Sequence, residues 1–187
     1  GDGVNDLAVG ASHNGGSDRG AVHIMFMNAD GTLKSDVVEI NSSNFTLAKK
    51  DHFGMSVANI GDLDGDGVND LAVGASGSNA GGDNKGAVYI LFMNDDGTVK
   101  ANEAICDSDV CNPNGPVLGV QDEFGASVAN IGDLDGDGVN DLAVGASLYD
   151  AADGYTDGAL FIVFMNDDGT VRETKVINSE NTSVEIG

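Results

Sequence analysis

The chain has 187 residues, of which 41% are apolar, and its 31 acidic and 8 basic residues give a formal net charge of −23. This length and composition allow one sizeable core, which excludes an acidic disordered tail. The charge excludes nucleic acid and anionic membrane surfaces as partners, and no apolar run approaches the roughly 20 residues that a membrane-spanning helix needs.

Three related units follow one another along the chain. The stretch from Phe53 to Ser76 returns almost unchanged from Phe124 to Ser147, and the opening residues 1–12 match its second half. We therefore expect units at 1–52, 53–123 and 124–187, with the beginning of the first one missing. A chain that starts inside a repeat is expected to be an excerpt of a longer protein or a part that associates with others.

Each unit reads as strands, because its segments are short, apolar or β-branched, and separated by glycine and aspartate. In the second unit the predicted strands lie near residues 54–60, 70–75, 86–93 and 98–105. The pair Asp96-Gly97 separates the last two strands and predicts a tight hairpin, since glycine accepts the positive φ that such a turn requires.

The third strand of the second unit, 86–93, is apolar on both alternating faces, so it should lie between two layers. An all-β chain of repeated four-stranded antiparallel sheets that cover one another predicts a β-propeller. A two-sheet sandwich is the alternative, but a sandwich gives no reason for so close a sequence repeat.

Two aspartate-rich loops occupy the connection between the first and second strands. Carboxylates at positions 1, 3, 5 and 9 of each loop, with a backbone carbonyl at position 7, bring hard oxygen ligands together, as calcium prefers. The predicted ligands are Asp62, Asp64, Asp66, Val68 and Asp70, and Asp133, Asp135, Asp137, Val139 and Asp141. Like charges about 5 Å apart repel by roughly 3 kcal/mol at an effective dielectric constant near 20, so folding should be coupled to metal binding.

The loops differ from an EF-hand, which needs a glutamate at position 12 and flanking helices, whereas this chain has Val73 and Val144 there. Magnesium is disfavoured because it retains water and resists an all-protein cage. An aspartate-rich turn that binds nothing remains the alternative.

These motifs resemble a known family. Phe53-Gly54, Phe124-Gly125, the aspartate loops and the Asp-Leu-Ala-Val-Gly-Ala strands are similar to the FG-GAP repeats of integrin α-subunit propellers and their bacterial relatives. The resemblance covers nearly the whole chain. It implies a propeller, typically seven-bladed in integrins, with calcium in the hairpin between strands one and two. The first loop departs from the pattern, because only Asp2, Val4 and Asp6 remain of its ligands. Three units also fall short of a closed ring, so further blades or copies are expected to complete it.

Loops on the face opposite the aspartate hairpins are candidates for recognition, since binding usually resides in loops on a rigid frame. These loops are Ser12 to Arg19, Gly77 to Lys85, Leu148 to Asp157 and the insert Ala101 to Glu123. They could equally be solvated connectors.

Cys106 and Cys111 in the insert favour a local disulfide in an extracellular setting, since a zinc site would need further ligands nearby. Asn41, Asn44 and Asn181 match the glycosylation pattern, which also arises by chance in such a sequence.

Catalytic motifs are not found in the sequence. His23 is expected to fill the core, where its counterparts are Tyr89 and Phe161, and His13 and His52 lie in loops without a matched acid or nucleophile. The expected function is therefore a calcium-binding module, extracellular or at the cell surface, for recognition, adhesion or scaffolding. Its partner would be an extracellular protein, a glycan, or further blades or copies of itself. A propeller that supports a secreted polysaccharide-cleaving enzyme and a self-assembling spacer or filament protein are the alternatives.

Overall fold

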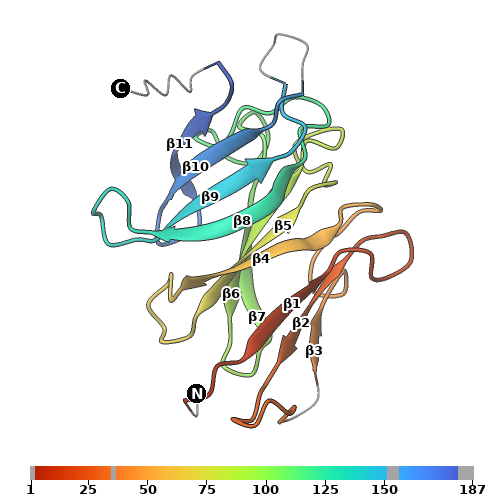
Figure 1. The fold of residues 1–187 in the computed structure, drawn as a ribbon, viewed down its shortest axis with the longest axis vertical. Coiled ribbons are helices and arrows are strands. Elements are labelled where there is room, and N and C mark those ends of the chain that lie inside the picture. Colours follow the sequence, from red (N-terminus) through yellow and green to blue (C-terminus); the bar gives the residue numbers. More distant parts are fainter. Residues whose placement is uncertain (1–2, 35–36, 151–155, 181–187) are drawn as a thin grey trace.

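The computed structural model describes residues 3–34, 37–150 and 156–180, whose strands form three antiparallel sheets (Figure 1). The first sheet contains β1 (Leu7–Ala11), β2 (Ala21–Met25) and β3 (Val38–Ile40). The middle sheet contains β4 (Phe53–Gly61), β5 (Asp70–Ala75), β6 (Ala87–Met93) and β7 (Val99–Ile105). The third contains β8 (Phe124–Gly132), β9 (Asp141–Ala146), β10 (Ala159–Met165) and β11 (Val171–Ile177). Across these ranges no helix is long and apolar enough to cross a membrane.

The four strands predicted for the second unit are confirmed to within a residue or so at their ends. The Asp-Gly hairpin is confirmed as well, because the Asn94 N–H donates to the Thr98 carbonyl at 2.8 Å and Gly97 has a φ of +80°. The first sheet begins with the counterpart of β5, so it lacks the strand that corresponds to β4 and β8. This agrees with an incomplete first unit.

The sheets stack as successive blades of a β-propeller. Strand β4 lies against β1 of the first sheet and β8 of the third, so the middle blade has a neighbour on each side. Every residue of β6 is buried, as expected for a strand between two layers. Its side chains alternate: Tyr89 and Leu91 pack toward the first blade, and Val88 and Ile90 pack toward the third.

The outer blades differ from this pattern because the described residues cover only one face of each. His23 in β2 is half-buried and pairs with Val9, which is 41% exposed, so the expectation that His23 fills a core is wrong within this chain. The physical reason is that its counterpart Tyr89 packs against the first blade, whereas the described residues place no blade against the His23 face of β2.

The insert is shorter than predicted. Ala101 belongs to strand β7, which continues to Ile105, so the loop starts at Cys106. Its Leu118 is buried in the core between the middle and third blades. The Asn114 carbonyl accepts a hydrogen bond from Thr174 Oγ1 of β11 at 2.8 Å. The insert is thus packed onto the third blade and is not a free loop.

Candidate metal sites

The first complete aspartate loop, 62–70, is held in a compact turn by its own carboxylates. Asp62 Oδ1 accepts the N–H of Asp66 at 2.9 Å, and Asp62 Oδ2 accepts the N–H of Gly67 at 2.8 Å. Gly65 and Gly67 have φ values of +75° and +92°, which glycine adopts at low cost. Asp66 Oδ1 in turn accepts the N–H of Val68 at 2.9 Å. The glycine and aspartate spacing therefore fixes a loop that folds around the Asp62 side chain.

The second loop, 133–141, repeats this geometry. Asp133 Oδ1 accepts the N–H groups of Gly136 at 2.6 Å and Asp137 at 3.1 Å, and Asp133 Oδ2 accepts that of Gly138 at 2.9 Å. These bonds, above all the one from Gly138, hold the pKa of Asp133 below its ordinary value. Val139 donates its N–H to Asp137 Oδ1 at 2.9 Å, as Val68 does in the first loop.

The last aspartate of each loop is fully buried. Asp70 accepts the N–H of Leu63 and that of Met93, the last residue of β6, both at 2.9 Å. Burial raises the pKa of Asp70 above its ordinary value, although both amide bonds oppose this. Asp141 makes the equivalent bonds to the N–H groups of Leu134 at 2.9 Å and Met165 at 3.1 Å. These two aspartates therefore join each loop to the third strand of its own blade.

Three of the predicted ligands converge in each loop. One carboxylate oxygen from each of Asp62, Asp64 and Asp70 lies within 4.8 Å of the other two, and the same holds for Asp133, Asp135 and Asp141. Two oxygens that bind one calcium ion at about 2.3–2.6 Å can be at most about 5 Å apart, so the donor set fits the ion. The Asp70 carboxylate has about four lone pairs and accepts the N–H groups of Leu63, Met93 and Asp64, so one lone pair remains able to coordinate.

In each loop a basic side chain pairs with the aspartates at both the third and the fifth position. Lys100 Nζ, from β7, lies 2.5 Å from Asp64 Oδ2 and also pairs with Asp66. In the third blade Arg172 takes this place: its Nη1 is 2.6 Å from Asp137 Oδ2, its other terminal nitrogen pairs with Asp135, and its guanidinium lies over the Phe164 ring. The bond from Lys100 is the main cause that lowers the pKa of Asp66.

Lys100 and Arg172 are the residues that the sequence reasoning missed. A signal was available, because a basic residue stands two positions after Asp-Gly-Thr in every unit, as Lys34, Lys100 and Arg172. The spacing alone did not reveal that this basic residue reaches the aspartate loop, since Lys100 and Asp66 are 34 residues apart in the sequence.

The incomplete first loop is only partly described. Asp2 lies outside the described residues, and Asp6 Oδ1 accepts the N–H of Met27 at 2.9 Å, as Asp70 does with Met93. Asp6 thus keeps the structural role of the last aspartate, whereas no three-carboxylate group is present around it among the described residues.

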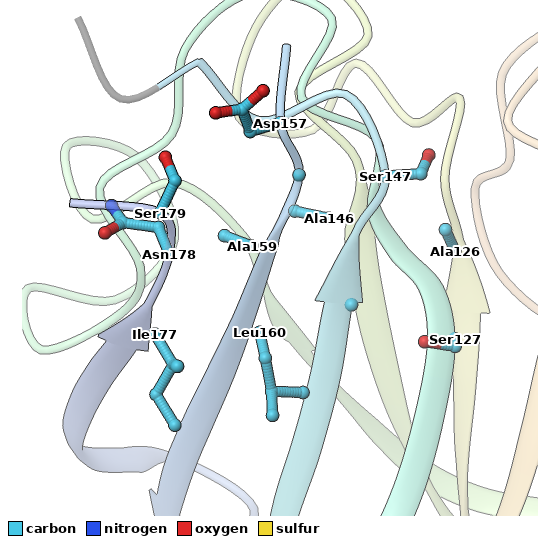
Figure 2. A pocket seen from close by; sticks show the side chains of 12 residues that line it. Ala126, Ser127, Ala146, Ser147, Asp157, Ala159, Leu160, Ile177, Asn178 and Ser179 are labelled. Atoms are coloured by element: carbon cyan, nitrogen blue, oxygen red, sulfur yellow. The ribbon is translucent and has the colours of Figure 1, made fainter. Parts of the chain in front are cut away.

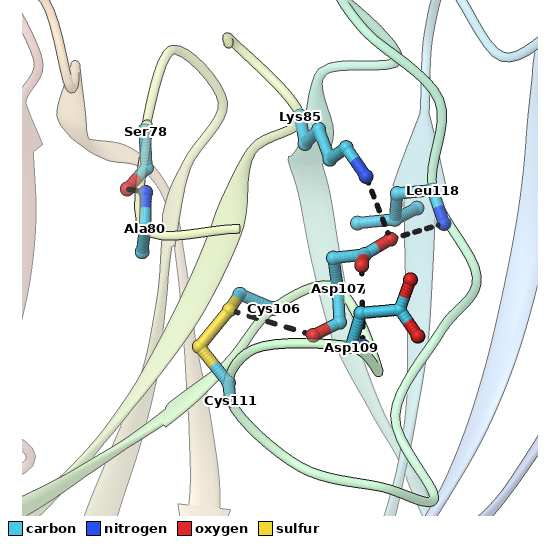
Figure 3. The surroundings of a disulfide bond; sticks show 8 residues. All are labelled: Ser78, Ala80, Lys85, Cys106, Asp107, Asp109, Cys111 and Leu118. Atoms are coloured by element: carbon cyan, nitrogen blue, oxygen red, sulfur yellow. Dashed lines mark hydrogen bonds and ion pairs between the residues drawn. A yellow bond between two sulfur atoms is a disulfide. The ribbon is translucent and has the colours of Figure 1, made fainter. Parts of the chain in front are cut away.

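The cysteine pair lies at the start of the insert (Figure 3). The sulfur atoms of Cys106 and Cys111 lie at bonding distance, and their Cα atoms are 5.4 Å apart. Between them, Asp107 forms an ion pair with Lys85 at 3.1 Å and accepts the N–H of Leu118 at 2.8 Å. Burial opposes ionisation of Asp107, but these two partners outweigh it and lower the pKa of the carboxyl.

Among the described residues, the remaining candidates do not gather into a further group of three metal ligands. The rings of His13 and His52 stack with centroids 5.1 Å apart, and Ser12 Oγ lies 3.0 Å from His13 Nδ1. Asn41 and Asn44 cap their own turn, since Asn44 Oδ1 accepts the N–H of Asn41 at 2.9 Å. Asn181 and part of the predicted loop Leu148 to Asp157 lie outside the described residues.

Comparison with known proteins places these features in a family. The sequence profile of the FG-GAP repeat matches residues 53–91 and 124–163. Integrin alpha-4 of Xenopus laevis is 33% identical over 185 residues, which cover 97% of this chain and 17% of that protein. Integrin alpha-PS5 of Drosophila melanogaster is 31% identical over 149 residues, covering 78% of this chain and 14% of the relative. Integrin alpha-2 of Mus musculus is 34% identical over 94 residues, which cover 50% of this chain and 7% of that protein.

The chain thus spans 17% or less of these three integrin α subunits. The two profile matches begin at Phe53 and Phe124, the first residues of β4 and β8, and each ends within the third strand of its blade. The repeat, the blade and the aspartate loop therefore coincide, and the chain belongs to the FG-GAP repeat family with integrin α subunits among its relatives.

Proposed function

We propose that the protein is a calcium-stabilised propeller module that acts outside the cell or at its surface, in recognition or adhesion, without catalytic activity. The observation that supports this best is the pair of equivalent loops, each with three carboxylates gathered within 4.8 Å. Similarity to integrin α subunits supports the extracellular setting and the adhesive role.

Asp62, Asp64 and Asp70 would hold calcium in the middle blade, with Asp66 and the Val68 carbonyl as additional ligands. Asp133, Asp135, Asp137, Val139 and Asp141 would do so in the third. A bound ion offsets the repulsion among clustered carboxylates, so its role here is structural. We also propose that the blades correspond to residues 1–52, 53–123 and 124–187.

The recognition role draws support from the insert between β7 and β8. Its side chains Val110, Val117 and Val120 are 62%, 75% and 64% exposed. Exposed apolar side chains on a loop held by a rigid frame are typical of binding surfaces. We further propose that Cys106 and Cys111 form a disulfide that holds the start of this insert. Unreduced protein should then fail to react with a thiol reagent until a reductant is added.

Removing calcium tests the proposal. A site saturated at 100 times its Kd contributes about 2.7 kcal/mol, so two sites contribute about 5 kcal/mol. For a domain of this size each kcal/mol shifts Tm by about 2–4 °C, so excess chelator should lower Tm by about 10–20 °C. Differential scanning calorimetry compares Tm under three conditions: with calcium, with excess chelator, and with magnesium added while a calcium-selective chelator removes calcium. Superimposable melting curves in calcium and chelator would rule out structural calcium.

A further inference from the structure

The chain contains two Asn-Gly pairs, Asn14-Gly15 and Asn114-Gly115. An asparagine side chain can react with the main-chain nitrogen of the residue that follows it. Glycine makes this reaction easiest, because it has no Cβ atom to shield that nitrogen and it adopts backbone conformations that other residues avoid. The two pairs are chemically alike, so a difference in their reactivity has to come from their surroundings in the fold.

The first pair lies in the loop between β1 and β2 and is open to solvent. Gly15 is exposed, and a Cβ atom built on it or on Gly16 would meet nothing within 4 Å beyond its chain neighbours. The Gly15 N–H donates to Asn14 Oδ1 at 2.7 Å. That oxygen is bonded to Cγ, so the Gly15 nitrogen lies close to the carbon that it would attack, and such proximity speeds a reaction.

The second pair is enclosed by the insert. Gly115 is buried, and its N–H donates to the Asn112 carbonyl at 2.8 Å. A Cβ atom on Gly115 would lie 2.8 Å from the Cys106 carbonyl oxygen. The Asn114 carbonyl in turn accepts the hydroxyl of Thr174 in the third blade at 2.8 Å. The Gly115 nitrogen is therefore engaged, and the insert has to open locally before this nitrogen can react.

The main chain at Asn14 closes its loop in the same way in every blade. The Asn14 N–H donates to the Ala11 carbonyl, and the Asn14 carbonyl accepts the N–H of Gly20, both at 2.9 Å. Ser78 and Tyr149 make the equivalent bonds in the middle and third blades. The loop joins two alanines that pair across adjacent strands: Ala11 and Ala21, Ala75 and Ala87, and Ala146 and Ala159, the last two of which line a surface hollow (Figure 2). Position 14 thus has a main-chain role that does not require an asparagine side chain.

The same loop holds the first blade to the middle one. Three of its consecutive carbonyls accept N–H groups from the residues at the start of β4: Ser17 from Lys50 at 2.8 Å, Asp18 from His52 at 3.2 Å, and Arg19 from Phe53 at 3.0 Å. The Asn14 side chain adds a bond within the first blade, from its Nδ2 to Glu39 Oε1 at 2.8 Å. A change in the main chain at position 14 would therefore disturb a loop on which the contact between two blades depends.

We propose that the fold leaves Asn14 open to spontaneous deamidation while it protects Asn114, and that the product weakens the contact between the first and middle blades. The Gly15 nitrogen bonds to Asn14 Cγ, the bond from Cγ to Nδ2 breaks, and Nδ2 leaves as ammonia with the proton of the Gly15 amide. Water then opens the resulting succinimide to aspartate or isoaspartate. Both products place a negative charge beside Glu39. In isoaspartate the main chain also runs through Cγ, so the carbonyl that bound Gly20 becomes part of a side-chain carboxylate.

Incubation of the whole chain at mildly alkaline pH, followed by peptide mapping with mass spectrometry, tests where the reaction occurs. In the folded protein Asn14 should convert faster than Asn114 by on the order of tenfold or more, because the second pair has to open first. In denaturant the two pairs should convert at comparable rates, since both are then unfolded Asn-Gly sequences. Equal rates in the folded protein, or a difference that persists in denaturant, would overturn the proposal.

Asn14→Ser is the matched control for the structural effect, because the middle blade has serine at this position, as Ser78, and serine has no amide to lose. Once most of Asn14 has converted, Tm of the parent chain should have fallen by about 2–4 °C, as expected for the loss of a main-chain hydrogen bond in a domain of this size. Tm of Asn14→Ser should stay nearly unchanged after the same incubation. An equal fall in both chains, or a parent chain whose Tm is unaltered by conversion, would contradict the proposed weakening.

Discussion

Single residues balance the charge of the aspartate loops. Lys100 and Arg172 come from the fourth strand of their blades and each pairs with two carboxylates of the adjacent loop. A cation built into the chain offsets the same repulsion that a bound ion would offset. An ion that binds there would have to compete with this cation for the carboxylates, so we expect the loops to depend less on metal than their aspartates suggest.

Lys100→Met should raise the calcium affinity of the 62–70 loop, because the ion no longer has to displace an ammonium. In chelator the variant should be less stable than the parent chain, because no cation then offsets the repulsion between the carboxylates. Exposed ion pairs contribute up to about 1 kcal/mol, so we expect at most about a fivefold change in Kd. Isothermal titration calorimetry measures it. The exposed Lys49→Met is the matched control, since it removes one charge at a site away from the loop. If Kd for calcium changed equally in Lys100→Met and Lys49→Met, the effect would come from net charge and not from the ion pair in the loop.

Asp51 makes stability depend on pH. It is 3% exposed, and its Oδ2 accepts the N–H of Ala48 at 2.7 Å. Burial raises the pKa of Asp51 above its ordinary value of 3.8. The folded state therefore holds this proton more tightly, so the contribution to stability is present below the unfolded pKa and is lost as pH rises through the folded pKa.

Asp51→Asn removes this pH dependence. The variant should gain stability relative to the parent chain as pH rises from below 3.8 to neutral, because asparagine carries no buried charge. Paired melting curves at several pH values give the difference in Tm directly. A constant difference across the range would mean that Asp51 is not the titrating group.

Contacts between blades depend on small residues in the second strand of each sheet. Gly74 in β5 lies against the Gly125 carbonyl, and Gly10 in β1 lies against that of Gly54. These positions explain why the strand is so poor in large side chains: its backbone has to approach the first strand of the next blade.

Gly74→Ala should therefore be strongly destabilising. Overpacking typically costs about 1–3 kcal/mol, which for this size of domain lowers Tm by about 2–12 °C. Gly145→Ala is the natural control, because the three atoms nearest to its Cβ would all belong to Ser127, and the closest of them is the hydroxyl oxygen, which can rotate away. Chemical denaturation measures both. Equal losses at the two positions would contradict a role for blade contact.

At the scale of the whole molecule, the two complete loops belong to different blades. Each is tied to its own third strand, through Asp70 to Met93 and through Asp141 to Met165. A loss of ligands in one loop should therefore leave the other intact.

Asp64→Ala tests this independence. If both loops bind calcium, titration calorimetry should show one site fewer in the variant, with the affinity of the 133–141 loop changed by less than about twofold. Asp135→Ala is the reciprocal variant. Loss of both sites in either variant would show that the blades bind as one unit.

Features that depend on residues near one another in the chain could be predicted from the sequence. Strand limits, the hairpin at Gly97 and the folded aspartate loops follow from apolar alternation and from where glycine and aspartate stand, so the blade and the convergence of Asp62, Asp64 and Asp70 could be predicted. The number of complete blades followed from the repeat.

Which faces are covered, and which distant residues meet, became known only from the three-dimensional structure. His23 and Tyr89 occupy one repeat position, yet among the described residues only Tyr89 is covered by a neighbouring blade. Ser56 meets Gly125 across 69 residues, and Lys100 reaches Asp66 across 34. Such contacts depend on how separate sheets stack and on which side chain reaches farthest, and no local periodicity encodes either.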